Sequence, residues 1–279
     1  MRCSATVSDK QTALVPAVAS VFPHAKHGLC QVHYFKNAAE PVADADEALK
    51  KTLRQAVRLD LKAVLRPQSP ENAGVLTVTG LLPSPIVALP ANAASVAPVV
   101  PADPSLAATL ATAERESIIQ DVVQRVRYLL TLKGRPPFRL AGIETYERLE
   151  AVVQCLEQLI QHDPDPRLVK VYDGLSRALK VVQGDYVQLR QAADWLTQIA
   201  EILDPAGKPA RSGAEVKAEW QTLLDQIKAE ALATPLLRDF SEKIIKVSAS
   251  YAPGLFYTYD VPREACHAPT MIAKASSAM

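Results

Sequence analysis

Residues 7–37, VSDKQTALVPAVASVFPHAKHGLCQVHYFKN, hold the pattern that decides the fold of the N-terminal part of the chain. Residues 2–8 predict a short buried strand, and the apolar stretch after Asp9 has the spacing of a helix. Residues 25–30 predict a second strand, and a basic helix is expected at about 33–66. The order strand, helix, strand, helix is typical of a piece of an α/β domain. Because two strands rarely form a stable sheet alone, we expect this piece to belong to a larger sheet.

The charge of the chain is balanced overall but not along its length. The whole sequence has 31 basic and 30 acidic residues, so it has no global field that would hold nucleic acid. Residues 1–66 are different, with ten Lys and Arg against six acidic residues. For most of these basic residues a solvated helix face is the simpler interpretation, and contact with DNA phosphates is the alternative. The candidates for DNA contact are Lys36, Lys50, Lys51, Arg54 and Arg58.

The cysteines and the apolar runs indicate the compartment. Four cysteines lie far apart with no CxxC pair, which favours reduced thiols in a cytosolic protein over a disulfide framework. No run approaches the roughly 20 apolar residues that span a bilayer, and the first residues lack the pattern of a signal peptide. We therefore expect a cytoplasmic protein with no membrane partner.

The rest of the chain divides by composition. Residues 67–105 hold eight prolines and two charged residues, which predicts a linker. Residues 106–251 have helical periodicity throughout, and five or six amphipathic helices are expected to pack as antiparallel hairpins. Breaks between these helices are predicted at residues 134–137, 163–166, 184 and 205–213. A seven-residue repeat of leucines, typical of a core or coiled-coil seam, is formed by Leu189, Leu196 and Leu203.

Two kinds of metal site are considered for residues 9–33. Zinc accepts His and Cys ligands, and four of them follow at intervals of three: His24, His27, Cys30 and His33. Side chains three apart on a strand point to opposite faces, which argues against convergence of all four on one ion. Asp9 follows a strand, where α/β folds place metal ligands, although an aspartate there is also a common helix N-cap.

The same stretch resembles the second catalytic block of the RNase H-like DDE transposases of bacterial insertion sequences, close to the mutator-like group. In that family a strand ends in Ser-Asp, a helix follows, and then come the pattern FPxAxHxxCxxH and an Asn. The resemblance covers about thirty residues. The residues that match are Ser8, Asp9, Phe22, Pro23, Ala25, His27, Cys30, His33 and Asn37.

This resemblance implies an α+β fold, with a partial RNase H-like α/β piece at residues 1–66 and a mostly α-helical insertion at 106–251. It implies that Asp9 is the second metal-binding carboxylate of a catalytic triad, with His27, Cys30, His33 and Asn37 as the supporting motif. Family members hold two Mg²⁺ or Mn²⁺ ions about 4 Å apart and cut and join DNA at the ends of the mobile element.

The first and third carboxylates of the family pattern are not found. The first is expected on an earlier strand, and residues 253–262 resemble the segment that leads to a TNN-x-x-E-like third block. Shifting the reading frame by two bases allows TNNDRESIFG with permitted codons, so residues 252–279 are expected to end in an out-of-frame tail that begins near Pro262. Sequencing the locus tests this frameshift.

The expected function is therefore that of a transposase fragment, inactive by itself and without a productively bound metal ion. The parent enzyme would act on DNA at the ends of the element. The alternative is an all-helical interaction module that self-associates into a homo-oligomer through the seams of residues 106–251.

Overall fold

The structure, a computed structural model, describes residues 5–10, 13–62, 104–137, 139–205 and 211–260. The predicted linker at 67–105 lies almost entirely outside these residues, as do the last residues of the chain. Within the described helices, no segment combines the length and the apolarity that crossing a bilayer requires.

The N-terminal unit has the predicted order of elements. Strand β1 (Ala5–Ser8) is followed by helix α1 (Leu14–Val21), strand β2 (Lys26–Leu29) and helix α2 (Gln31–Leu61). The strands pair in parallel, from Ala5 opposite Lys26 to Ser8 opposite Leu29. Strand β1 is only partly buried, because the described residues form a two-stranded sheet that covers little of it.

The remaining described elements are helical. They are α3 (Pro104–Leu129), α4 (Ala141–His162), α5 (Pro166–Leu203), α6 (Gly213–Glu230), η2 (Ala231–Ala233), α7 (Pro235–Leu255) and η3 (Tyr257–Tyr259). Three predicted breaks, at residues 134–137, 163–166 and 205–213, fall between these helices and are confirmed. The break predicted at Gly184 is wrong, because α5 runs through it. Helix α2 contains Pro41 and continues on both sides of it.

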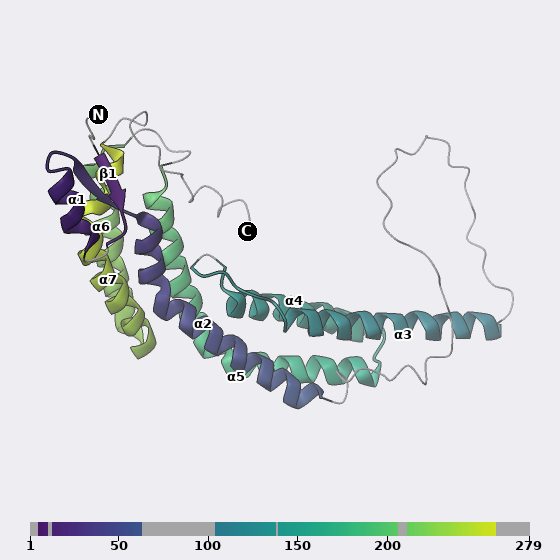
Figure 1. Ribbon diagram of the computed structural model, residues 1–279. Helices are drawn as coiled ribbons and strands as arrows, with labels where there is room; N and C mark the ends of the chain where they lie inside the picture. Colours follow the sequence, from purple (N-terminus) through teal and green to yellow (C-terminus); the bar gives the residue numbers. More distant parts are fainter. Residues whose placement is uncertain (1–4, 11–12, 63–103, 138, 206–210, 261–279) are drawn as a thin grey trace, which may run out of the picture.

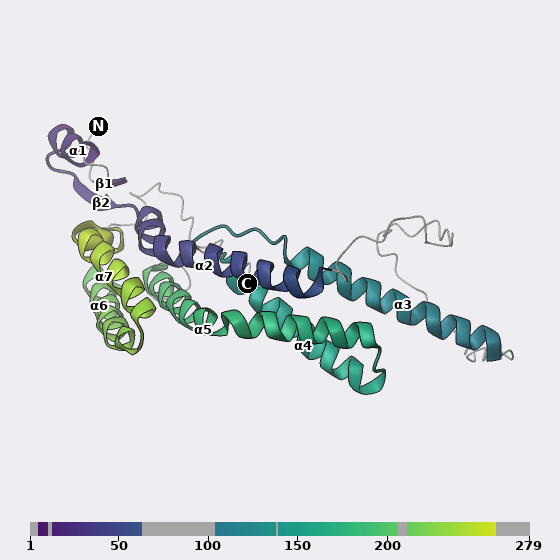
Figure 2. The same ribbon diagram turned by 90° about the horizontal axis from the view of Figure 1, so that it is seen from below.

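The helices form an elongated bundle with the sheet at one end. Figures 1 and 2 show α2 and α5 side by side, with α4 packed against both of them. Helices α6 and α7 stand at the end of this bundle that carries the sheet, and α7 contacts β2 and α2. The part of α3 that precedes its contact with α4 extends beyond the α4–α5 hairpin (Figures 1 and 2). The chain is therefore mainly helical with a small parallel sheet, which places it in the α+β class.

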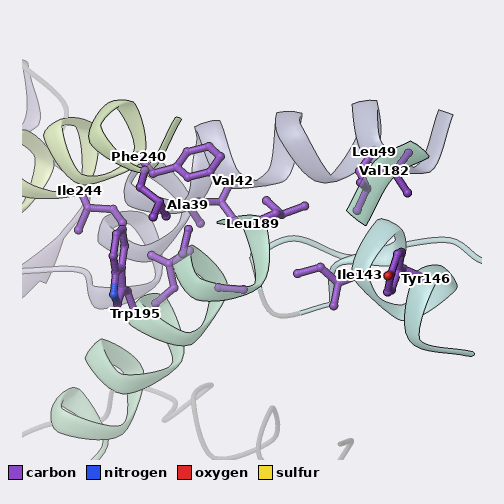
Figure 3. Close-up of a cluster of buried hydrophobic side chains, with 14 of the residues drawn as sticks. Ala39, Val42, Leu49, Ile143, Tyr146, Val182, Leu189, Trp195, Phe240 and Ile244 are labelled. Carbon is purple, nitrogen blue, oxygen red and sulfur yellow. The ribbon is translucent and has the colours of Figure 1, made fainter. Parts of the chain in front are cut away.

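One apolar core joins the long helices. Figure 3 shows buried side chains of α2, α4, α5 and α7, among them Val42, Leu189 and Phe240. The three leucines of the seven-residue repeat are all buried in this core, Leu189 and Leu203 almost completely and Leu196 nearly so. The repeat is thus a seam within the chain, where α5 meets its neighbours.

A buried carboxylate fixes α4 against α2. The residue before α4, Leu140, gives no side-chain cap, and Asp46 of α2 supplies it instead. Its two carboxylate oxygens accept hydrogen bonds of 2.8 Å from the backbone N–H groups of Gly142 and Ile143. These satisfy orphan donors of the first helical turn. Burial raises the pKa of Asp46, and the two N–H donors oppose that rise.

Candidate functional site

The two parallel strands bring the candidate residues to one edge of the sheet. Strand β1 ends at Ser8 and strand β2 at Leu29, so Asp9 and Cys30 follow equivalent strand ends. The Cys30 N–H donates a hydrogen bond of 2.9 Å to the Ser8 carbonyl, which extends the ladder by one step. The carboxyl ends of parallel strands are the edge at which α/β sheets place ligand-binding residues.

Two histidines of the motif contact the strand end that carries Asp9. Cys30 is the N-cap of α2, which places His33 in the first turn of that helix. The Nε2 atom of His33 lies 3.5 Å from Oδ2 of Asp9, and the two side chains are 44% and 28% exposed. The Ser8 hydroxyl lies 2.6 Å from Nε2 of His27. The structure thus brings together Ser8, Asp9, His27 and His33, while Asp9 remains accessible to solvent.

The alternative role of Asp9 as a helix cap is wrong. Helix α1 begins at Leu14 and its N-cap is Ala13, which makes no side-chain hydrogen bond to the helix. Asp9 lies four residues before that cap, and its side chain is beside His33 instead.

Helix α7 completes the site from the far end of the chain. The Asn37 amide donates a hydrogen bond of 2.9 Å to the Tyr251 hydroxyl. The Lys10 ammonium donates to the Ser250 carbonyl at 2.7 Å and lies 5.3 Å from the centre of the Tyr251 ring. Burial raises the pKa of Tyr251, and the nearby Asp9 carboxylate raises it further. Sequence reasoning missed Ser250 and Tyr251, because contacts between such distant segments leave no local pattern.

Residues 252–260 are an integral part of the fold. A Cβ atom added at Gly254 would lie 2.7 Å from Cγ of Leu29, so α7 and β2 are in close contact. The Tyr259 hydroxyl donates a hydrogen bond of 2.5 Å to the Leu203 carbonyl. Asp260 accepts one of 2.7 Å from the N–H of Gly213 at the start of α6. The frameshift predicted near Pro262 lies outside the described part of the chain.

The candidates for DNA contact lie in different environments. Lys36, Lys51 and Arg58 are exposed on α2. Lys50 of α2 donates a hydrogen bond to the carbonyl of Leu132, which lies in the segment between α3 and α4. Arg54 is partly buried, and its Nε makes no hydrogen bond with the described residues. The structure leaves three of the five side chains turned to solvent.

The donor set at the strand end does not fit a two-metal centre. Such a centre holds two hard cations about 4 Å apart and needs several carboxylate ligands. In the described ranges, no group of three or more His, Cys, Asp or Glu side chains is placed to hold a metal ion. The carboxylate of Asp9 faces the imidazole of His33.

Comparisons with protein-family models, with curated proteins and with solved structures found no match for this chain.

Proposed function

We propose that this chain derives from the catalytic core of a DDE-type transposase and that it binds DNA without cleaving it. In this proposal residues 1–66 are the partial RNase H-like piece, and α3 to α7 belong to the helical insertion. Asp9 occupies the position of the family's second carboxylate.

The observation that carries the proposal is the convergence of the motif residues. Three contacts support it: Ser8 with His27, Asp9 with His33, and Asn37 with Tyr251. The first two connect β1 to β2 and to α2, and the third connects α2 to α7. Ser8, Asp9, His27 and His33 thus lie together at the end of β1, and Asn37 lies one turn further along α2 than His33.

The absence of cleavage follows from the chemistry of phosphoryl transfer. Two divalent ions activate the attacking hydroxyl and stabilise the leaving oxygen, and a single carboxylate supplies too few oxygen ligands to hold both. DNA binding needs no such centre, because contacts with phosphates supply most of the affinity of non-specific complexes.

The test combines binding and cleavage on the purified 279-residue protein. Fluorescence anisotropy with a labelled duplex is expected to show binding that weakens as salt is raised. Incubation of supercoiled plasmid with Mg²⁺ or Mn²⁺ is expected to show no nicking. If the wild-type protein does not bind the duplex at low salt, the proposal is contradicted. Nicking by the wild-type chain that disappears in the variant Asp9→Asn would also contradict it.

A further inference from the structure

A shallow cleft lies where α6 turns into α7 through η2. Its walls carry three basic side chains, Lys228 from the end of α6 and Arg238 and Lys246 from α7. Glu242 is the acidic residue of the lining, and the other lining residues are Ala231, Leu232, Ser241 and Ile245. The cleft therefore combines an excess of positive charge with apolar side chains.

These three cations lie together around one cleft, whereas two other cations of the bundle surface have acidic partners. Arg167 pairs with Glu116, and Lys243, on the same helix as the cleft residues, pairs with Glu40. Lys228, Arg238 and Lys246 are exposed and make no ion pair with any residue in the described part of the chain. Three unpaired positive charges around one cleft favour an anionic partner over an internal structural role.

The side of α7 that lines the cleft leads towards the contact between Ser250 and Lys10. Arg238, Glu242, Lys246 and Ser250 follow at intervals of four, so they form one ridge of the helix. Ser250 is the residue whose carbonyl and hydroxyl accept hydrogen bonds from Lys10. The ridge from position 238 to position 250 is about 18 Å long, at 1.5 Å per residue. That length is close to the axial rise of about five base pairs of DNA at 3.4 Å each.

We infer that the backbone of DNA lies along this ridge of α7, held by Lys228, Arg238 and Lys246 and guided to the strand end by Lys10. The inference rests on the proposed function and adds the path of the DNA to it. Because phosphate contacts carry no sequence information, this surface would position DNA irrespective of its sequence.

The test is the salt dependence of duplex binding. The variant Lys228→Gln, Arg238→Gln, Lys246→Gln removes three phosphate contacts. Its slope of log K against log salt is expected to fall by about 2.7, at roughly 0.9 for each contact. The matched control Lys133→Gln, Lys170→Gln, Lys180→Gln removes three exposed lysines elsewhere on the bundle and is expected to keep the wild-type slope within about 1 unit. Circular dichroism establishes that both variants are folded.

Each outcome decides between the two proposals. If the wild type binds DNA and the cleft variant matches the control, the inference is overturned and the proposed function stands. If the wild type binds no DNA, the proposed function fails and the inference with it. If the cleft variant keeps its DNA binding but loses binding to poly-glutamate, the cleft serves an acidic protein segment and the inference is wrong.

Discussion

The Asn37 side-chain amide donates a hydrogen bond of 2.9 Å to the hydroxyl of Tyr251, and the two residues are 214 positions apart in the sequence. This contact fixes α7 against the first turns of α2, next to the Asp9–His33 pair. The C-terminal helix therefore belongs to the same structural unit as the N-terminal motif, although the sequence between them is mostly a separate run of helices.

Removing the Tyr251 hydroxyl tests how much this contact contributes. In Tyr251→Phe the ring remains to pack against Tyr34 and under Lys10, while the hydrogen bond with Asn37 is lost. We expect the free energy of unfolding to fall by about 1 kcal/mol, the usual contribution of one such bond. Urea denaturation measures it. Tyr128→Phe, on a side chain that is 56% exposed, is the control and should leave stability unchanged.

A double-mutant cycle with Asn37→Ala separates the contact from other effects. If the hydrogen bond is the source of the loss, the two single changes will not add, because the second removes nothing that the first has left. Additive losses would contradict the assignment.

Substitution by alanine at two glycines is expected to change the stability of the protein in opposite directions. A Cβ atom at Gly142 would overlap the backbone carbonyl oxygen of Asp46, whereas a Cβ atom at Gly184 meets no other atom within 4 Å. We expect Gly142→Ala to destabilise the protein by about 1–3 kcal/mol through overpacking. Gly184→Ala is expected to stabilise it by about 0.5–1 kcal/mol, because alanine favours the helix and restricts the unfolded chain.

Thermal unfolding of both variants against the wild type is the measurement. Equal shifts of the melting temperature in the same direction would show that the close approach of α2 and α4 at Gly142 is not as described.

The sequence allowed the elements to be predicted where the signal was local. The alternation of strand and helix around Asp9 and the apolar stripes of the helices correspond to the observed order. Gly184 was misread because glycine weakens a helix by only about 1 kcal/mol. Burial of the neighbouring Val182 and Leu189 on the same face of α5 outweighs that cost.

The arrangement of the candidate site was predictable only in part. The parallel pairing that sets Asp9 beside Cys30 follows from the two strand ends, but the place of His33 depends on where α2 begins. The roles of Asp46 and Tyr251 were not predicted. Each acts on a segment about 100 or more residues away, and such pairs leave no periodicity in a single sequence.

The leucine seam of α5 is expected to stabilise the monomer. Leu189→Ala removes a side chain that is 1% exposed, and we expect the free energy of unfolding to fall by about 2–5 kcal/mol. The control Val187→Ala, two positions away and 57% exposed, is expected to change it by less than about 0.5 kcal/mol.

Light scattering of the same two variants examines the alternative of self-association through this seam. If Leu189→Ala left stability unchanged but turned an oligomer into a monomer, the seam would lie between chains. That result would contradict the burial of Leu189 within one chain.

Stability at alkaline pH depends on a tyrosine pair between α4 and α5. The rings of Tyr146 and Tyr186 are stacked at 3.8 Å, and the Tyr186 hydroxyl donates a hydrogen bond of 3.2 Å to Glu147. Burial, together with the negative charge of Glu147, raises the pKa of Tyr186 to about 12. The folded state therefore holds this proton more tightly than the unfolded state, in which the pKa is about 10.

The sign of the effect follows from this difference. The stability that the protonated hydroxyl contributes is fully present below pH 10 and is lost as the pH rises from 10 to about 12, because the unfolded chain releases its proton first. The Tyr186→Phe variant lacks that proton, so its urea midpoint should fall less steeply across this window than the wild-type midpoint. Tyr128→Phe is the control and should follow the wild type. Parallel curves for the wild type and Tyr186→Phe would mean that Tyr186 titrates alike in the folded and unfolded states, and that the stacked pair does not shield it from water.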